Sequence, residues 1–517
     1  MSMPPGRAVP TSAAGPPAVR LGSCTQKAFD DSRRVVTHAA SRLYLPVARE
    51  ETSCRPMRIP LSIEDSMTQI LLKVKSAFLN TIESSFARYD GSRIQKRAFV
   101  FSSSILYFFG LWKWSLFFRF GNMDFVSADW YKELAFYSVF RQALIDGSVP
   151  YHVDGIIHGT NRFIALPELI FSPQIFILKY TSNIGLFILI HALVLFTVGF
   201  LGCVAIQRRF QLSVFSFLTL TGIFSFSGYI TAHFAVGHTM WGGYFLLPWF
   251  FLAIMKTTDG ARSMRVNALW ISMALFLIWL QGSLHILVGC LVYLVLFAAF
   301  NLKHIRVVAL SFVFVFILCF FRLFPALISF TEHELYFQSG YPTIRDLFDA
   351  FTVIKVPSIE MIGGLTGALY WWELDLFIGA LALSFLLFFG IFMAQKQGET
   401  DYGFSEFTYP NLIIALFAVS HFYGLIANLP IPLTSVERVP SRMMIIPVLM
   451  VLIFACVKFD HFMKKYQSIV IVHWLAIFAL IQTFFELMTH MRYWNVPVVN
   501  TCLLYTSDAA DECCGVG

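Results

Sequence analysis

The sequence is dominated by long apolar runs separated by short polar gaps. A helix needs about 20 apolar residues to cross the hydrocarbon core of a bilayer, and shorter helices are tolerated inside a bundle. By this criterion the pattern predicts about eleven transmembrane helices. They lie at about 98–118, 183–206, 211–231, 239–255, 266–280, 286–302, 307–329, 376–394, 410–428, 443–457 and 467–489. We therefore predict an all-α polytopic membrane protein.

Basic residues mark every second gap. Arg93, Lys96 and Arg97 precede the first run, which places that end in the cytoplasm, because short cytoplasmic loops retain Lys and Arg. Counting onward, each loop predicted to be cytoplasmic is basic. The outer loops are then 119–182, 232–238, 281–285, 330–375 and 429–442.

The first outer loop is long, and its pattern predicts amphipathic helices. Apolar residues recur at helical spacing after Asp129. The run 164–178 is interrupted by Pro167, Glu168 and Pro173, so we expect a re-entrant or interfacial segment there.

Composition supports the membrane assignment. Hydrophobic residues make up 57% of the chain and charged residues 13%, whereas a soluble domain carries about 25% charged residues. The net charge of +7 resides largely in the inner gaps, so it indicates topology and no nucleic-acid partner is expected. Four cysteines inside apolar runs are predicted to be buried, without the spacing of a metal site: Cys203, Cys290, Cys319 and Cys456.

Both ends differ from the apolar body. Residues 1–56 are rich in Pro, Ala, Ser and Arg, which predicts a disordered extension or a start site placed too early. Residues 57–96 are predicted to form a cytoplasmic interfacial segment, and 97–490 the membrane domain. In the last part, 491–517, the stretch CLLYTSDAADE resembles a translated sequencing adapter, so we expect a truncated natural end there.

Two acids follow the first predicted span, Asp124 and Asp129. Asp129 precedes a periodic apolar run, so its spacing favours a helix N-cap. The alternative is a carboxylate that accepts a proton from a hydroxyl or ligates a divalent cation.

Three histidines fall at one predicted membrane depth. His233 and His238 lie between the third and fourth predicted spans, and His285 lies in the QGSLH break. Histidines at helix ends are often hydrogen-bonded surface groups. Three imidazoles at one level also suit phosphate recognition or proton handling.

Two further outer loops carry candidate groups. Arg438 and Arg442 stand in RVPSR, where snorkelling at the interface and anion binding are both open. The loop 331–375 contains Glu334 and the aromatic group Tyr370, Trp371 and Trp372. These aromatics favour an interface belt, with sugar stacking as the alternative.

Taken in order, four patterns resemble the GT-C superfamily of membrane glycosyltransferases, most closely its bacterial YfhO-type branch. They are the acid in ADWYKELAFYSVFRQALIDGSVPY, the span end FSGYITAHFAVGHTMW with Pro248 in the next span, the QGSLH break, and RVPSR before a late span. The resemblance covers about 97–490, although PYHVDG replaces the Trp-Asn-Pro wording often found after the first acid.

The resemblance implies transfer of a sugar from a polyprenyl-phosphate donor to an acceptor on the outer face of a bacterial inner membrane. Asp129 would be the general base, with Asp124 as its rival. Donor phosphate would be held by His233, His238, Arg438 and Arg442, with His285 at the same level; Glu334 is the candidate second acid. Membrane lipids are expected partners, and a divalent cation is left open.

Two other classes compete with this interpretation. A transporter or flippase of lipid-linked saccharides would favour charges near the bilayer midplane and an internal repeat, and neither is evident. A membrane O-acyltransferase would need a deep histidine, for which His191, His421 and His473 are available.

Overall fold

The computed structural model describes residues 68, 83–125, 128–148, 168–260, 263–330, 340–355, 362–363, 368–393, 404–427 and 439–499. The chain divides into two units, Met1–Ile70 and Leu71–Gly517, and the description below concerns the second. The predicted extension 1–56, most of the interfacial segment 57–96 and the tail beyond 499 lie outside the described residues.

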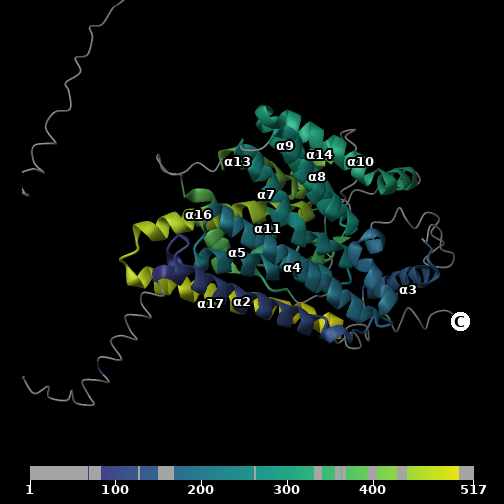
Figure 1. Cartoon of the computed structure of the whole chain (residues 1–517), viewed down its shortest axis with the longest axis horizontal. Coiled ribbons are helices and arrows are strands. Elements are labelled where there is room, and N and C mark those ends of the chain that lie inside the picture. Colours follow the sequence, from purple (N-terminus) through teal and green to yellow (C-terminus); the bar gives the residue numbers. More distant parts are fainter. Residues whose placement is uncertain are drawn as a thin grey trace, which may run out of the picture. The chain divides into compact units, whose positions relative to one another are not determined.

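Helices dominate the described residues (Figure 1). The α-helices are α2 Arg93–Phe117, α3 Trp130–Asp146, α4 Ile184–Phe210, α5 Val214–Phe226, α6 Gly228–Ala235, α7 Leu247–Thr258, α8 Met264–Leu280, α9 Leu284–Phe300, α10 Ile305–Phe330, α11 Ile344–Thr352, α12 Ala380–Phe385, α13 Ser405–Phe417, α14 Ser420–Ala427, α16 Ile445–Lys465 and α17 Val470–Val499. A π-helix, Leu386–Phe392, continues α12. Two short antiparallel strands pair, β1 Ile362–Gly363 with β2 Ala368–Leu369.

Short 3₁₀ helices connect or extend these elements. They are Arg119–Gly121, Leu169–Phe171, Pro173–Tyr180, Thr239–Leu246, Leu302–His304, Trp371–Glu373 and Pro440–Met444. The two between 169 and 180 occupy the proline-interrupted segment of the first outer loop.

Five described helical segments are long and apolar enough to cross a membrane, which identifies the chain as a helical integral membrane protein. They are Ile184–Phe210, Val214–Ala235, Leu302–Phe324, Pro440–Lys465 and Val470–Asn495. Helices also occupy the other predicted spans, but several are short, including Met264–Leu280, Leu284–Phe300 and Ala380–Phe392. The count of about eleven therefore stays a prediction.

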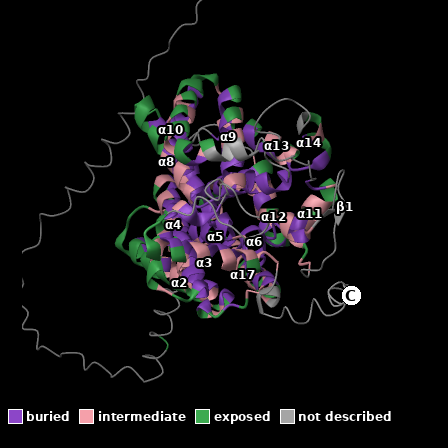
Figure 2. Cartoon of the chain, turned by 90° about the vertical axis from the view of Figure 1, so that its right-hand side faces the viewer, coloured by how far each residue is buried: buried purple, intermediate pink, exposed green. Residues whose placement is uncertain are grey.

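Burial separates an inner layer from a lipid-facing layer. The most apolar window of Val214–Ala235 is 94% buried, whereas that of Val470–Asn495 is only 17% buried. Figure 2 shows α5 and α6 mainly in the buried colour and much of α10 in the exposed colour. The four cysteines predicted to be buried are buried.

Ion pairs between distant segments join loops predicted on the same side. Arg209 bonds Asp259, and Lys303 bonds Glu406, all four in or beside predicted inner loops. Between predicted outer loops, Arg442 bonds Glu373, and the His238 ring lies 3.3 Å from the Asp129 carboxylate. These pairs agree with the alternation inferred from charge.

Candidate functional site

Asp129 stands immediately before α3, at the N-cap position, but its side chain makes no capping hydrogen bond. The predicted N-cap position is therefore confirmed, but the carboxylate does not cap the helix and bonds other groups instead. Its Oδ2 lies 3.3 Å from the Nζ of Lys132 and 3.3 Å from the Nε2 of His238. The side chain is 43% exposed, so a solute reaches it from outside the protein.

Two histidines continue from Asp129 into the bundle. The Nδ1 atoms of His233 and His238 are 3.0 Å apart, so one ring donates a proton and the other accepts it. Because the Nε2 of His238 faces a carboxylate, both ring nitrogens of His238 are engaged. Protonating one ring would therefore change the tautomer of the other.

Gly237 allows the turn that carries His238 to pack closely against the start of α3. Its φ is +92°, and a Cβ atom built there would lie 2.8 Å from the backbone nitrogen of Trp130. The Asp129 amide also donates to the Val236 carbonyl at 3.0 Å. The turn after α6 thus packs directly against the start of α3 and sets His238 beside Asp129.

Trp241 connects the histidine pair to the next segment. His233 stacks on its ring with centroids 3.9 Å apart and an angle of 6° between the planes. His285 stacks near-parallel to the same indole, with centroids 5.4 Å apart. The guanidinium carbon of Arg442 lies 5.2 Å from the Trp241 centroid, a cation–π contact.

Arg442 is buried and bonds a carboxylate with two of its nitrogens. Its Nε donates to Glu373 at 2.7 Å and a terminal nitrogen donates at 2.6 Å. The other terminal nitrogen lies 3.2 and 3.1 Å from the two ring nitrogens of His285. The Tyr229 hydroxyl holds the Arg442 carbonyl at 3.1 Å, which fixes the arginine backbone against α6.

A buried acidic group lies behind Asp129. The Nζ of Lys132 is 3.6 Å from a Glu133 oxygen and 3.7 Å from a Glu168 oxygen. Both glutamates are buried. Thr239, in the segment after His238, donates its hydroxyl to Glu133 at 2.6 Å.

The charges around Asp129 change the pKa values of this group. Burial alone would raise the pKa of Asp129, but the His238 hydrogen bond and the Lys132 charge outweigh it and lower the pKa to about 2. Burial raises the pKa of Glu168 well above its usual value, and the charge of Glu133 raises it further. Burial likewise raises the pKa of Glu133, so the two glutamates hold a proton more tightly than isolated ones.

Glu373 behaves in the opposite way. Burial favours its neutral form, yet the adjacent Arg442 charge and hydrogen bonds dominate and hold the pKa of Glu373 well below its usual range. The Arg442–Glu373 pair is thus a closed ion pair.

A second buried polar cluster lies next to the site and holds its helices together. One oxygen of Asp375 accepts from His490 at 2.9 Å and from Trp494 at 2.8 Å, and its other oxygen accepts from the Phe377 amide. Phe377 stacks on His490, and its carbonyl accepts from the Gly228 amide at 2.7 Å. This cluster fixes α17 to the start of α6 and to the segment that carries Glu373.

Five of the predicted site residues fall in one continuous set of contacts: Asp129, His233, His238, His285 and Arg442. We call this set, with Trp241 and Glu373, the outer polar chain. Asp124 is not part of it, because it is exposed and bonds Arg119 at 2.7 Å. Glu334 and Arg438 lie outside the described residues.

Sequence reasoning missed Glu373, Trp241 and the buried group Lys132, Glu133 and Glu168. A signal was available for Lys132 and Glu133, since they follow Asp129 by three and four residues and so share its helix face. No comparable spacing marks Glu373. Among the described residues, no group of three or more His, Cys, Asp or Glu could hold a metal ion.

Comparison with protein families, with curated proteins and with solved structures finds no match to this chain. The class that fold and composition define is a helical integral membrane protein. Any narrower assignment depends on the outer polar chain itself.

Proposed function

We propose that the protein is a GT-C type glycosyltransferase of a bacterial inner membrane. It would transfer a sugar from a polyprenyl-phosphate donor to an acceptor on the extracytoplasmic face. The observation that carries the proposal is the outer polar chain, which joins a half-exposed carboxylate, two linked imidazoles and a buried guanidinium from separate segments.

The reaction assigns one task to each end of the outer polar chain. An acceptor hydroxyl attacks the anomeric carbon, a new carbon–oxygen bond forms, and the hydroxyl proton passes to Asp129. The bond from the anomeric carbon to the donor phosphate breaks, and polyprenyl phosphate leaves as an anion. Fixed cations near that anion stabilise the charge as it develops.

The low pKa of Asp129 defines how such a base would work. A pKa of about 2 keeps the carboxylate ionised at neutral pH, but it is a weak base in the ground state. The hydroxyl proton becomes strongly acidic only as its oxygen bonds carbon, so transfer to Asp129 is late. Acceptor binding that displaces Lys132 or His238 would strengthen the base.

The donor site faces competition within the protein. Glu373 occupies two nitrogens of Arg442 with the geometry that a phosphate would use. Donor phosphate must therefore share or displace this carboxylate. We expect Glu373→Gln to tighten donor binding, because it removes the competing charge without removing the side chain.

The decisive experiment uses purified protein in detergent, where no second compartment exists. Radiolabelled polyprenyl-phosphate sugar is mixed with candidate acceptors, and labelled product is separated from donor. Product that depends on Asp129 supports the proposal and is incompatible with a pure flippase. If donor binds but no acceptor class yields product, and the protein moves donor across vesicle membranes, the glycosyltransferase proposal is rejected in favour of a transporter.

A further inference from the structure

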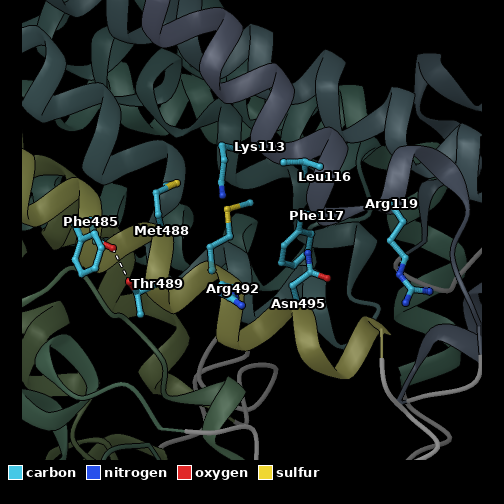
Figure 3. A pocket seen from close by; sticks show the side chains of 10 residues that line it. Lys113, Leu116, Phe117, Arg119, Phe485, Met488, Thr489, Arg492 and Asn495 are labelled. Carbon is cyan, nitrogen blue, oxygen red and sulfur yellow. Dashed lines mark hydrogen bonds between the residues drawn. The ribbon is translucent and has the colours of Figure 1, made fainter.

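A cleft lined by basic residues lies between the outer parts of α2 and α17, away from the outer polar chain (Figure 3). Its volume is about 550 Å³. The basic side chains are Lys113, Arg119 and Arg492, and the apolar wall includes Phe117, Phe485 and Met488. In Figure 3 the Lys113 side chain extends from α2 toward α17.

Two of these cations have no acidic partner among the described residues. Lys113 and Arg492 make no ion pair, whereas Arg119 bonds Asp124 at 2.7 Å. Arg492 is close enough for its charge to repel the Lys113 ammonium. Like charges that face one cleft destabilise the protein unless an anion from outside neutralises them.

The cleft offers a polar group besides the two cations. The side-chain oxygen of Asn495, which lines the same cleft, is buried and has no hydrogen-bond partner. The Asn495 NH₂ group can donate to a phosphate oxygen, whereas its side-chain oxygen can accept only from a hydroxyl of the head group.

Apolar surface leads to the cations along both helices. Phe108 and Trp112 on α2 are exposed, as are Phe478 and Phe485 on α17. Both helices belong to the lipid-facing layer and lie side by side (Figure 1). The exposed rings would lie along the acyl chains of a lipid on this surface, and the cations at the level of its phosphate.

We propose that this cleft binds the phosphodiester head group of an anionic membrane phospholipid, with Lys113 and Arg492 as its ligands and the exposed rings of α2 and α17 along its acyl chains. The proposal is independent of the glycosyltransferase assignment. It rests on two cations without an ion-pair partner among the described residues and on the apolar surface that leads to them.

The test measures lipid binding to the purified full chain in detergent by native mass spectrometry. Phosphatidylglycerol, phosphatidylcholine, polyprenyl phosphate and inorganic phosphate are titrated separately. The test variant is Lys113→Gln with Arg492→Gln. The matched control, Lys179→Gln with Arg345→Gln, removes the same charge from two exposed outer positions.

We expect phosphatidylglycerol to bind more tightly than phosphatidylcholine. Each basic residue near a charged lipid contributes about five-fold in affinity, so the test variant should bind phosphatidylglycerol about 25-fold more weakly. The control should bind it as the natural chain does. Thermal unfolding of both variants without lipid checks that the fold is kept.

Three results would overturn the proposal. Equal loss in the test and control variants would show general charge attraction. Full competition by inorganic phosphate would make the ligand a soluble anion. Tighter binding of polyprenyl phosphate, dependent on Lys113 and Arg492, would assign the cleft to a lipid-linked substrate.

Discussion

The outer polar chain and the basic cleft handle charge in opposite ways. In the outer polar chain each charged end has a partner of opposite sign, since Asp129 lies beside Lys132 and Arg442 bonds Glu373. In the cleft, Lys113 and Arg492 face each other without an acid among the described residues. The first arrangement is preorganised by the protein itself, and the second is completed only by an external anion.

The difference follows from burial. Arg442 and Glu373 are enclosed, where an unpaired charge would be costly, so each must bring its own counter-ion. Arg492 is exposed and Lys113 half-buried, at a depth where lipid phosphates are available. Removing one charged side chain should therefore destabilise the protein far more in the outer polar chain than in the cleft.

The largest expected effect is on catalysis by Asp129→Asn. Loss of a positioned general base lowers turnover by about 10²–10⁴-fold. Donor affinity should fall far less than turnover, because Arg442, the guanidinium assigned to the donor phosphate, has its own partner in Glu373. Asp124→Asn is the matched control, and normal turnover by Asp129→Asn would reject the base assignment.

The next effect is on stability. Arg442→Met leaves the Glu373 carboxylate buried without a partner, which should reduce the free energy of unfolding by about 3–5 kcal/mol. Adding Glu373→Met should recover most of this loss but not donor binding. Chemical unfolding in detergent gives the stability, and a double variant that still binds donor would remove Arg442 from the donor site.

A smaller effect concerns pH. Lys132→Met removes a neighbouring cation, so the pKa of Asp129 should rise from about 2, and the acid limb of kcat/KM should move to higher pH. The lowered pKa of Asp129 also makes the stability of the folded protein depend on pH. The folded pKa lies below the ordinary 3.8, so the stabilisation exists above that value and is lost as pH falls toward 2. Lys179→Met, at an exposed outer position, should leave the profile unchanged.

The smallest expected effect is in the cleft, where a substitution should stabilise the protein instead of destabilising it. Lys113→Glu would pair with Arg492, so it should stabilise the detergent-solubilised protein by about 0.5 kcal/mol. It should also abolish the preference for phosphatidylglycerol. Destabilisation of lipid-free protein by this variant would mean that the two cations are already neutralised within the chain.

The sequence predicted the helices well, because apolar length and basic gaps follow directly from the bilayer. Apolar length did not settle the number of spans. Helices such as α9 are shorter than the bilayer requires of a single helix, and a bundle tolerates such short helices. The role of Asp129 was ambiguous for a similar reason. Local spacing predicts a cap, whereas its actual partner, His238, comes from a helix turn more than a hundred residues later.

Pairs such as Arg442 with Glu373 could not be predicted from spacing. Their residues lie 69 positions apart and meet only because the bundle packs Pro440–Met444 against Trp371–Glu373. Stacking of His233 and His285 on Trp241 likewise depends on tertiary packing. Shared membrane depth was the one property of these histidines that the sequence indicated.

Cysteine labelling gives the most direct test of a single site on the outer face. In a background where all nine cysteines of the sequence are replaced by Ser, single cysteines are introduced at Asp129, Arg345 and Lys464. Intact cells are treated with a membrane-impermeant maleimide. Asp129→Cys and Arg345→Cys should react, and Lys464→Cys should react only after permeabilisation. Reaction of the first two from opposite sides of the membrane would place the loops that carry Asp129 and Glu373 on different faces and would contradict a common outer site.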